Sequence, residues 1–249
     1  RVNYQGVLQQ LKDKYGKKIA PFQLPMREGE KITGFINVVE QEARKFDGDR
    51  TVTAEMPEGM ENELLPLREM INEAVAETSE ELMDKYFSGE AFTLPEMYEA
   101  LRNGVAAGDV VPVLCGSAYH KLGISSLMNA IHAYFPAPNS KDEFVIGKKK
   151  DGSESRLKID VSDPLSALVF KTVADPYVGK LSYFKVYSGV MTPDTTLYNM
   201  NKDTNEKIGK IYTMQGKKQI EAESLNAGDI GAVAKLTKTG TGDTLSGLN

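Results

Sequence analysis

Cysteine and histidine are scarce in this chain of 249 residues, and both scarcities exclude classes of site. Cys115 is the single cysteine, so an internal disulfide and a cysteine-cluster metal site are excluded. The two histidines, His120 and His132, flank a segment rich in Leu, Ile and Met, which argues against a histidine-based zinc site. A soluble chain that is poor in cysteine and close to neutral fits the cytoplasm.

Long apolar runs are also missing. No uninterrupted apolar segment approaches the roughly 18–20 residues that a membrane span needs, so no membrane partner is expected. The chain opens at Arg1 without a charged-then-apolar leader and ends at Asn249 after a turn-rich stretch, so we expect an internal piece of a longer protein. A hydrophobic content of 41% and a charged content of 26% are typical of a globular chain.

Motifs for nucleotide chemistry are absent as well. The sequence contains no Gly-x-x-x-x-Gly-Lys-Ser/Thr phosphate loop and no Asn-Lys-x-Asp guanine-reading motif. Residues 201–204 come near the second motif, but Thr204 stands where Asp is needed. There is no plausible catalytic triad, metal cluster or pair of catalytic carboxylates, so we expect this chain not to be an enzyme by itself and to hold no metal.

Charge and periodicity divide what is present into two parts. Residues 1–140 carry 14 Lys/Arg and 21 Asp/Glu, a net charge of −7, whereas residues 141–249 carry 16 and 14, a net charge of +2. Helical spacing dominates the first part and strand-like alternation the second. The polar residues 141–162 predict a linker or mobile loop, and its lysines 148–150 are interpreted as solvated rather than as a nucleic-acid contact.

The fold class predicted is α/β followed by all-β. In the first part we expect helices over residues 3–15, 60–87, 93–107 and 124–135, and short strands over residues 19–24, 35–39 and 110–115. Thr93 and Glu96 predict a capping box at the start of the third helix. In the second part we expect a small closed barrel, whose strands cover residues 165–172, 180–187, 195–199, 208–214 and 230–236.

A first candidate site is the small-residue loop Gly116-Ser117-Ala118. It follows a predicted strand, and ligands of open α/β sheets lie beyond the carboxyl ends of strands. Its backbone N–H groups could approach a flat ligand and donate to an acceptor such as guanine O6. From the residues alone, a tight strand-to-helix turn is the favoured interpretation, and Cys115 reads as a packed core thiol rather than a nucleophile.

A second candidate is an acidic stripe, in which Glu69, Glu73, Glu77, Glu81 and Asp84 recur every three or four residues along one predicted helix, with Glu80 adjacent. Between Glu55 and Glu99 there are 13 acidic residues and only two basic ones. Like charges at this spacing oppose a helix by roughly 0.2–0.5 kcal/mol per pair. The stripe therefore indicates either a binding surface for a basic partner or a solvated face.

Six stretches, in this order along the chain, resemble bacterial elongation factor G: Tyr4–Lys12, Ala20–Pro25, Glu77–Tyr86, Val113–Ala118, Thr172–Leu181 and Thr241–Leu245. Pro112–Gly116 and Gly231–Leu236 look closer to the elongation-factor-G-like paralogues. The resemblance implies that residues 1–140 are the C-terminal part of a P-loop GTPase-type α/β domain, with an insert subdomain over about 26–105. Residues 141–162 would be a linker, and residues 163–249 the translation-factor β-barrel.

The resemblance also implies a nucleotide site. Gly116, Ser117 and Ala118 match the loop that contacts guanine in the family, and Tyr119 stands beside it. The phosphate loop, the switch regions and the catalytic histidine would precede Arg1. GTP or GDP with Mg²⁺ would therefore belong to the longer protein, and we expect no nucleotide on this chain alone.

The partners implied are ribosomal. Glu73, Glu77, Glu80, Glu81 and Asp84 match the insert helix that meets the ribosomal stalk protein, and the barrel matches the domain that docks on small-subunit ribosomal RNA. The implied function is GTP-dependent movement of tRNA and mRNA, with this chain monomeric. A ribosomal protection factor of the same architecture and a ribosome-associated adaptor without GTPase activity remain as alternatives.

Overall fold

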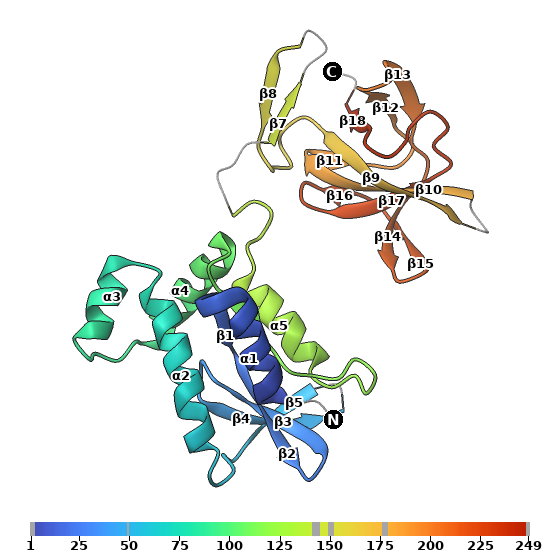
Figure 1. Ribbon diagram of the computed structural model, residues 1–249. Coiled ribbons are helices and arrows are strands. Elements are labelled where there is room, and N and C mark those ends of the chain that lie inside the picture. Colours follow the sequence, from blue (N-terminus) through green and yellow to red (C-terminus); the bar gives the residue numbers. More distant parts are fainter. Residues whose placement is uncertain (1–2, 49, 141–144, 149–151, 176–178, 248–249) are drawn as a thin grey trace. The chain divides into compact units, whose positions relative to one another are not determined.

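The computed structural model describes residues 3–48, 50–140, 145–148, 152–175 and 179–247. The chain splits into two compact units, Arg1–Pro136 and Ala137–Asn249, each of which is described by itself (Figure 1). Helices and short sheets make up the first unit, and strands make up the second. The predicted fold class, α/β followed by all-β, is confirmed.

Two sheets meet in the first unit. Strands β1 (Ile19–Pro21) and β6 (Val111–Val113) form a parallel pair. The second sheet is antiparallel and runs in the order β2 (Gln23–Glu28), β3 (Lys31–Asn37), β4 (Glu42–Asp47), β5 (Arg50–Ala54). The strand predicted over residues 19–24 is therefore two strands in different sheets. Phe22 joins them, because its N–H donates to Val113 O and its carbonyl accepts from Val38 N.

Local signals place the helices of this unit, which are α1 (Tyr4–Tyr15), α2 (Glu61–Ala76), α3 (Glu80–Phe87), α4 (Leu94–Ala107) and α5 (Ile124–Tyr134). Asn3 caps α1 by accepting a hydrogen bond from Gly6 N at 3.2 Å, and Gly16 ends it with φ of 71°. A short 3₁₀ turn, η1 (Gly16–Lys18), follows. The capping box of Thr93 and Glu96 is confirmed at the start of α4.

The predicted acidic helix is wrong as a single helix. α2 ends at Ala76, and α3 begins only at Glu80. The Thr78 hydroxyl donates to Val75 O at 2.7 Å, and Ser79 Oγ accepts from Leu82 N at 3.2 Å. Short hydroxyl side chains compete with the helical hydrogen bonds and favour a helix start, which explains the break.

One core holds these elements together, with fully buried side chains from β2, β3, α2 and α4: Leu24, Ile36, Ile71, Met97 and Leu101. Arg68 extends from α2 and donates to Val38 O at 3.0 Å and to Val39 O. Burial lowers the pKa of Arg68, yet its hydrogen bonds attach α2 to the chain just after β3. Arg68, one of the two basic residues between Glu55 and Glu99, thus has a structural role.

The second unit contains the expected barrel. Its eight-stranded sheet runs β13-β12-β18-β9-β10-β17-β14-β15 and surrounds one hydrophobic core. The strands are β9 (Ser166–Asp175), β10 (Gly179–Ser188), β12 (Thr196–Asn199), β13 (Thr204–Lys207), β14 (Ile211–Gln215), β15 (Lys218–Ala222), β17 (Ile230–Ala234) and β18 (Thr244–Ser246). A separate short antiparallel pair consists of β11 (Val190–Met191) and β16 (Leu225–Asn226).

The five strands predicted for this unit correspond to β9, β10, β12, β14 and β17, whereas β11, β13, β15, β16 and β18 were not predicted. The predicted linker contains a hairpin of β7 (Val145–Lys148) and β8 (Glu154–Leu157). Residues 141–144 and 149–151 lie outside the described residues, and so do the lysines at positions 149 and 150. The boundaries proposed for the linker, the insert and the barrel remain predictions.

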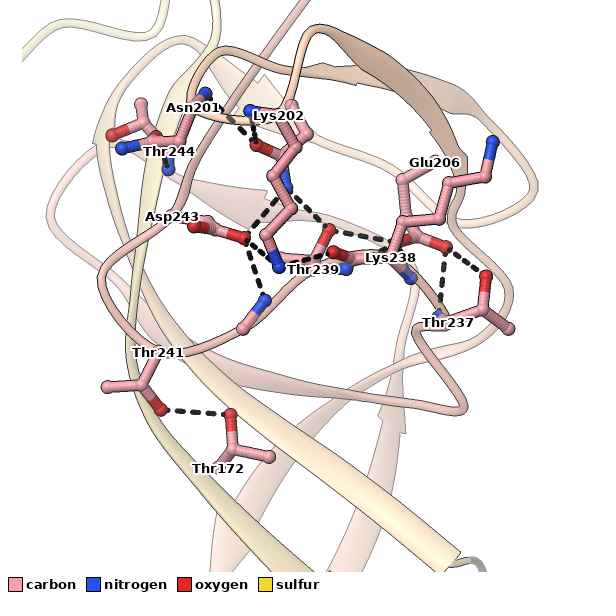
Figure 2. Close-up of polar contacts among 12 residues, drawn as sticks. Thr172, Asn201, Lys202, Glu206, Thr237, Lys238, Thr239, Thr241, Asp243 and Thr244 are labelled. Atoms are coloured by element: carbon pink, nitrogen blue, oxygen red, sulfur yellow. Dashed lines mark hydrogen bonds and ion pairs between the residues drawn. The ribbon is translucent and has the colours of Figure 1, made fainter.

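A buried carboxylate on β13 fixes the loop after β17 (Figure 2). Glu206 is only 4% exposed and accepts hydrogen bonds from the N–H groups of Thr237, Lys238 and Thr239 at 3.1, 2.8 and 2.8 Å. The hydroxyls of Thr237 and Thr239 add two more. Burial opposes ionisation of Glu206, but these hydrogen bonds outweigh it and lower its pKa.

A second carboxylate joins this loop to the end of β12 (Figure 2). Asp243 accepts from Asn199 Nδ2 at 2.9 Å and from Gly240 N at 2.8 Å, and it pairs with Lys202 at 3.2 Å. Asn199 Oδ1 in turn accepts from the N–H groups of Asn201 and Lys202. Burial opposes ionisation of Asp243, but the hydrogen bonds from Asn199 and Gly240 and the Lys202 contact lower its pKa.

We expect Glu206→Gln to destabilise the barrel by about 1.5–3 kcal/mol, because an amide nitrogen would face the N–H groups of Lys238 and Thr239. Urea unfolding followed through barrel NMR signals measures this. Glu221→Gln is the matched control, because the Lys210–Glu221 pair is exposed and should change stability by less than about 0.5 kcal/mol. Equal effects of both substitutions would contradict the role of Glu206.

The barrel should also lose stability in acid. In the unfolded chain, Glu and Asp have pKa values of about 4.3 and 3.9, so carboxylates with lower pKa values in the folded state stabilise the fold above those pH values. This contribution disappears as the pH falls through the folded pKa values of Glu206 and Asp243. We therefore expect the urea concentration at the unfolding midpoint, measured from pH 7 to about pH 3, to decrease once the pH is below about 4. The decrease should be less steep in Glu206→Gln.

Candidate functional site

The predicted guanine loop lies between β6 and α5 and is closed by its own backbone. Ser117 and Leu122 exchange two hydrogen bonds, both of 2.9 Å. A Cβ at Gly116 would lie 2.7 Å from Leu122 O, so the close approach requires glycine. Gly123 is the N-cap of α5 and has a φ of 77°, a conformation that glycine adopts readily.

A buried glutamine holds the start of this loop. Gln23 of β2 is 5% exposed, and its Oε1 accepts from Cys115 N at 3.0 Å. Its main-chain carbonyl accepts from the Tyr4 hydroxyl of α1 at 2.9 Å. Burial raises the pKa of Cys115 to about 12, which keeps its thiol protonated and agrees with the packed-thiol interpretation.

The four predicted residues form one surface loop. Gly116, Ala118 and Tyr119 are exposed, and the Tyr119 side chain reaches 90% exposure beside His120, with 4.9 Å between ring centroids. The Ser117 N–H is used by Leu122, whereas the Ala118 N–H donates to no described residue. Of these two amides, Ala118 is the one that could donate to guanine O6. The guanine contact itself stays a prediction.

The acidic residues come from two helices and the turn between them. Glu73 lies on α2, Glu77 just beyond its end, and Glu80, Glu81 and Asp84 on α3, all of them exposed. A hollow of about 460 Å³ is lined by Glu77, Glu80 and Asp84 together with Ser79 and Met83. Glu73 and Glu81 are not among its lining residues. The helix break thus concentrates three carboxylates around one concavity.

Few described cations neutralise this acidic hollow. Lys17 pairs with Glu77 at 3.5 Å, and both side chains are exposed, so the pair is weak. The other predicted acidic residue, Glu69, lies on α2 and accepts from the Tyr86 hydroxyl. The hollow therefore presents net negative charge to a partner.

The barrel has an aromatic and basic face that was not predicted from the sequence. Along β10, Tyr183, Lys185 and Tyr187 alternate with fully buried side chains. Lys185 Nζ lies 5.3 Å from the Tyr187 ring centre, and Lys171 Nζ lies 5.9 Å from that of Tyr183. Phe170 is 44% exposed at a register shift between β9 and β10. The alternation of residues 183–187 could have been recognised in the sequence. The exposure of Phe170 could not, because it depends on the bulge between β9 and β10.

Other classes of site are not found in the described part of the chain. No group of three or more His, Cys, Asp or Glu side chains there is placed to hold a metal ion. None of the described helices is long and apolar enough to cross a membrane.

Comparison with known proteins agrees with the motifs. The family model for elongation factor G domain 2 matches residues 164–248. The crystal structure of a protein from Thermus thermophilus superimposes with a TM-score of 0.80 at 26% sequence identity, over 100% of this chain and 34% of that one. The chain thus spans about a third of the protein it matches. Residues 164–248, in the second unit, are thus similar to elongation factor G domain 2, and the whole chain is similar to part of the Thermus thermophilus protein.

Proposed function

We propose that this chain is part of a ribosome-binding translational GTPase that moves tRNA and mRNA at the expense of GTP. The domain 2 match supports the translation-factor assignment. The observation that carries the GTPase assignment is that the parallel sheet of the first unit has only two described strands. Among the described residues, β1 and β6 pair only with each other, whereas parallel sheets are normally larger and covered on both faces.

Helix α5 supports the same conclusion. It follows β6, and a stripe of apolar residues along it is 40–58% exposed: Ile124, Leu127, Met128, Ile131 and Phe135. These positions recur at helical spacing, which is typical of a helix that packs on a sheet. An exposed stripe of this size indicates a surface that another part of the protein covers. Further strands of a GTPase domain would supply that cover.

In such a domain, residues 116–119 would contribute a rim of the guanine pocket. The Ala118 N–H would donate to guanine O6, and Tyr119 would flank the base. GTP or GDP with Mg²⁺ would depend on a phosphate loop that this sequence lacks. This chain would therefore recognise the base weakly and the phosphates not at all.

Calorimetry should find no GDP binding to residues 1–249, because most of the charge-assisted contacts of a nucleotide site are missing. A dissociation constant in the micromolar range would contradict this. The Ala118→Pro variant removes the proposed donor and serves as the control, since any binding through this loop should disappear in it.

Two surfaces fit ribosomal partners. The acidic hollow of Glu77, Glu80 and Asp84 complements a basic protein surface such as that of the stalk protein. The barrel face of Tyr183, Lys185 and neighbouring residues combines cations with aromatic rings, as surfaces that bind RNA often do. Contact of the barrel with small-subunit ribosomal RNA would use this face.

We expect the chain to sediment with ribosomes at low salt, and Glu80→Lys combined with Asp84→Lys to weaken this by about tenfold or more, because the hollow changes sign. The matched control is Glu61→Lys combined with Glu63→Lys, which makes the same charge change at the start of α2. Equal weakening by both pairs would reject the hollow as the contact. No sedimentation at any salt concentration would reject the ribosomal assignment.

A further inference from the structure

A cavity of about 300 Å³ opens in the first unit, apart from the guanine loop and the acidic hollow. Its lining comes from α4, α5, the antiparallel sheet and the junction at Phe22. Residues that matter for its chemistry are Phe22, Gln23, Glu40, Arg44, Tyr98 and Tyr134. This volume is at the lower end of the range for ligand pockets, about 300–1,000 Å³, and suits a single ring system.

Aromatic rings form one side of this cavity. The Phe22 and Tyr134 rings meet edge to face with 4.7 Å between centroids. Tyr98 stacks on Tyr134 at 5.7 Å with an interplanar angle of 19°. Flat aromatic surfaces favour a planar ligand, which can stack on them or meet their edges.

The charged residues of the cavity neutralise each other. Glu40 accepts hydrogen bonds from Asn37 Nδ2 at 2.7 Å, from Arg44 Nη2 at 3.1 Å, and from the Tyr98 hydroxyl. With one carboxylate and one guanidinium paired in this way, the lining carries little net charge. An uncharged ligand suits it better than an ion.

Two side chains that line the cavity, Gln23 and Arg44, have a donor without an acceptor among the described residues. Gln23 must keep Oε1 toward the Cys115 N–H, since an amide nitrogen cannot accept that hydrogen bond. Its Nε2 consequently points the other way, and it donates to no described residue. Arg44 also has a buried Nε without a partner. Gln23 lines the cavity, so its Nε2 can donate to an acceptor that a ligand brings there.

We propose that this cavity binds a small, uncharged, planar ring compound that carries a carbonyl or ring-nitrogen acceptor. The ring lies against Phe22, Tyr98 and Tyr134, and its acceptor receives the Gln23 Nε2 hydrogen bond. This binding site goes beyond the proposed function and does not need it. Because Gln23 Oε1 accepts the Cys115 N–H, a ligand bound in the cavity also changes the environment of the loop that follows Cys115.

The test is an NMR titration of the whole chain with nicotinamide, a neutral planar ring with an amide oxygen. We expect saturable binding with a dissociation constant below about 1 mM and a shift of the Cys115 amide signal. Cyclohexanecarboxamide has the same amide on a puckered ring and should bind at least about tenfold more weakly, because it stacks poorly on the aromatic rings.

Two substitutions fill the cavity from different elements, Ala133→Leu on α5 and Thr51→Leu on β5. Each should weaken nicotinamide binding at least about tenfold. Two variants are used so that a folding defect in one of them does not decide the test. His132→Leu is the matched control on α5, since His132 is exposed and does not line the cavity.

Three results would overturn the proposal: no saturation up to about 10 mM nicotinamide, unchanged affinity in both filled variants, or binding that leaves Cys115 unmoved. The titration contains neither nucleotide nor ribosome. Its failure would therefore leave the proposed function intact, and a failure of the ribosome experiment would leave this site intact.

Discussion

The buried side chain of Gln23 is the contact on which the first unit depends. Its Oε1 accepts a hydrogen bond from the Cys115 N–H after β6, and the main-chain carbonyl of Gln23 accepts one from the Tyr4 hydroxyl of α1. The adjoining Phe22 connects the parallel pair to the antiparallel sheet. Phe22 and Gln23 together thus connect the first helix, the two sheets and the start of the candidate guanine loop. An apolar residue at this position would fill the space but would leave the Cys115 N–H unsatisfied.

Short-range signals explain what the sequence could predict. The Thr93–Glu96 capping box and the stop at Gly16 depend on neighbouring residues only, and both are present. The alternation in β9 and β10 likewise depends on one buried face. The break at Ser79 was missed because the acidic spacing continues across it, although serine before two glutamates is itself a helix-start signal.

Long-range polar contacts could not be predicted. Glu206 is separated from the loop it holds by 31 to 33 residues, and nothing in its neighbourhood marks it as buried. The Thr241–Leu245 stretch, which carried part of the family resemblance, includes Asp243 and therefore has a structural role in this barrel. The four residues predicted for the guanine site form one surface loop, and only the fold distinguishes the amide of Ser117, which is hydrogen-bonded to Leu122, from that of Ala118.

Helix α3 has no fully buried residue, and that has a consequence for the acidic hollow. Lys85 attaches the helix to α4 through an ion pair of 2.7 Å with Glu96, the same carboxylate that completes the capping box of α4. An element held by so few apolar contacts opens at low free energy, so its amides should exchange with deuterium well before those of α2 and α4. Three of the five residues that line the hollow lie on α3, so this side of the hollow can change shape without disturbing the core of the unit.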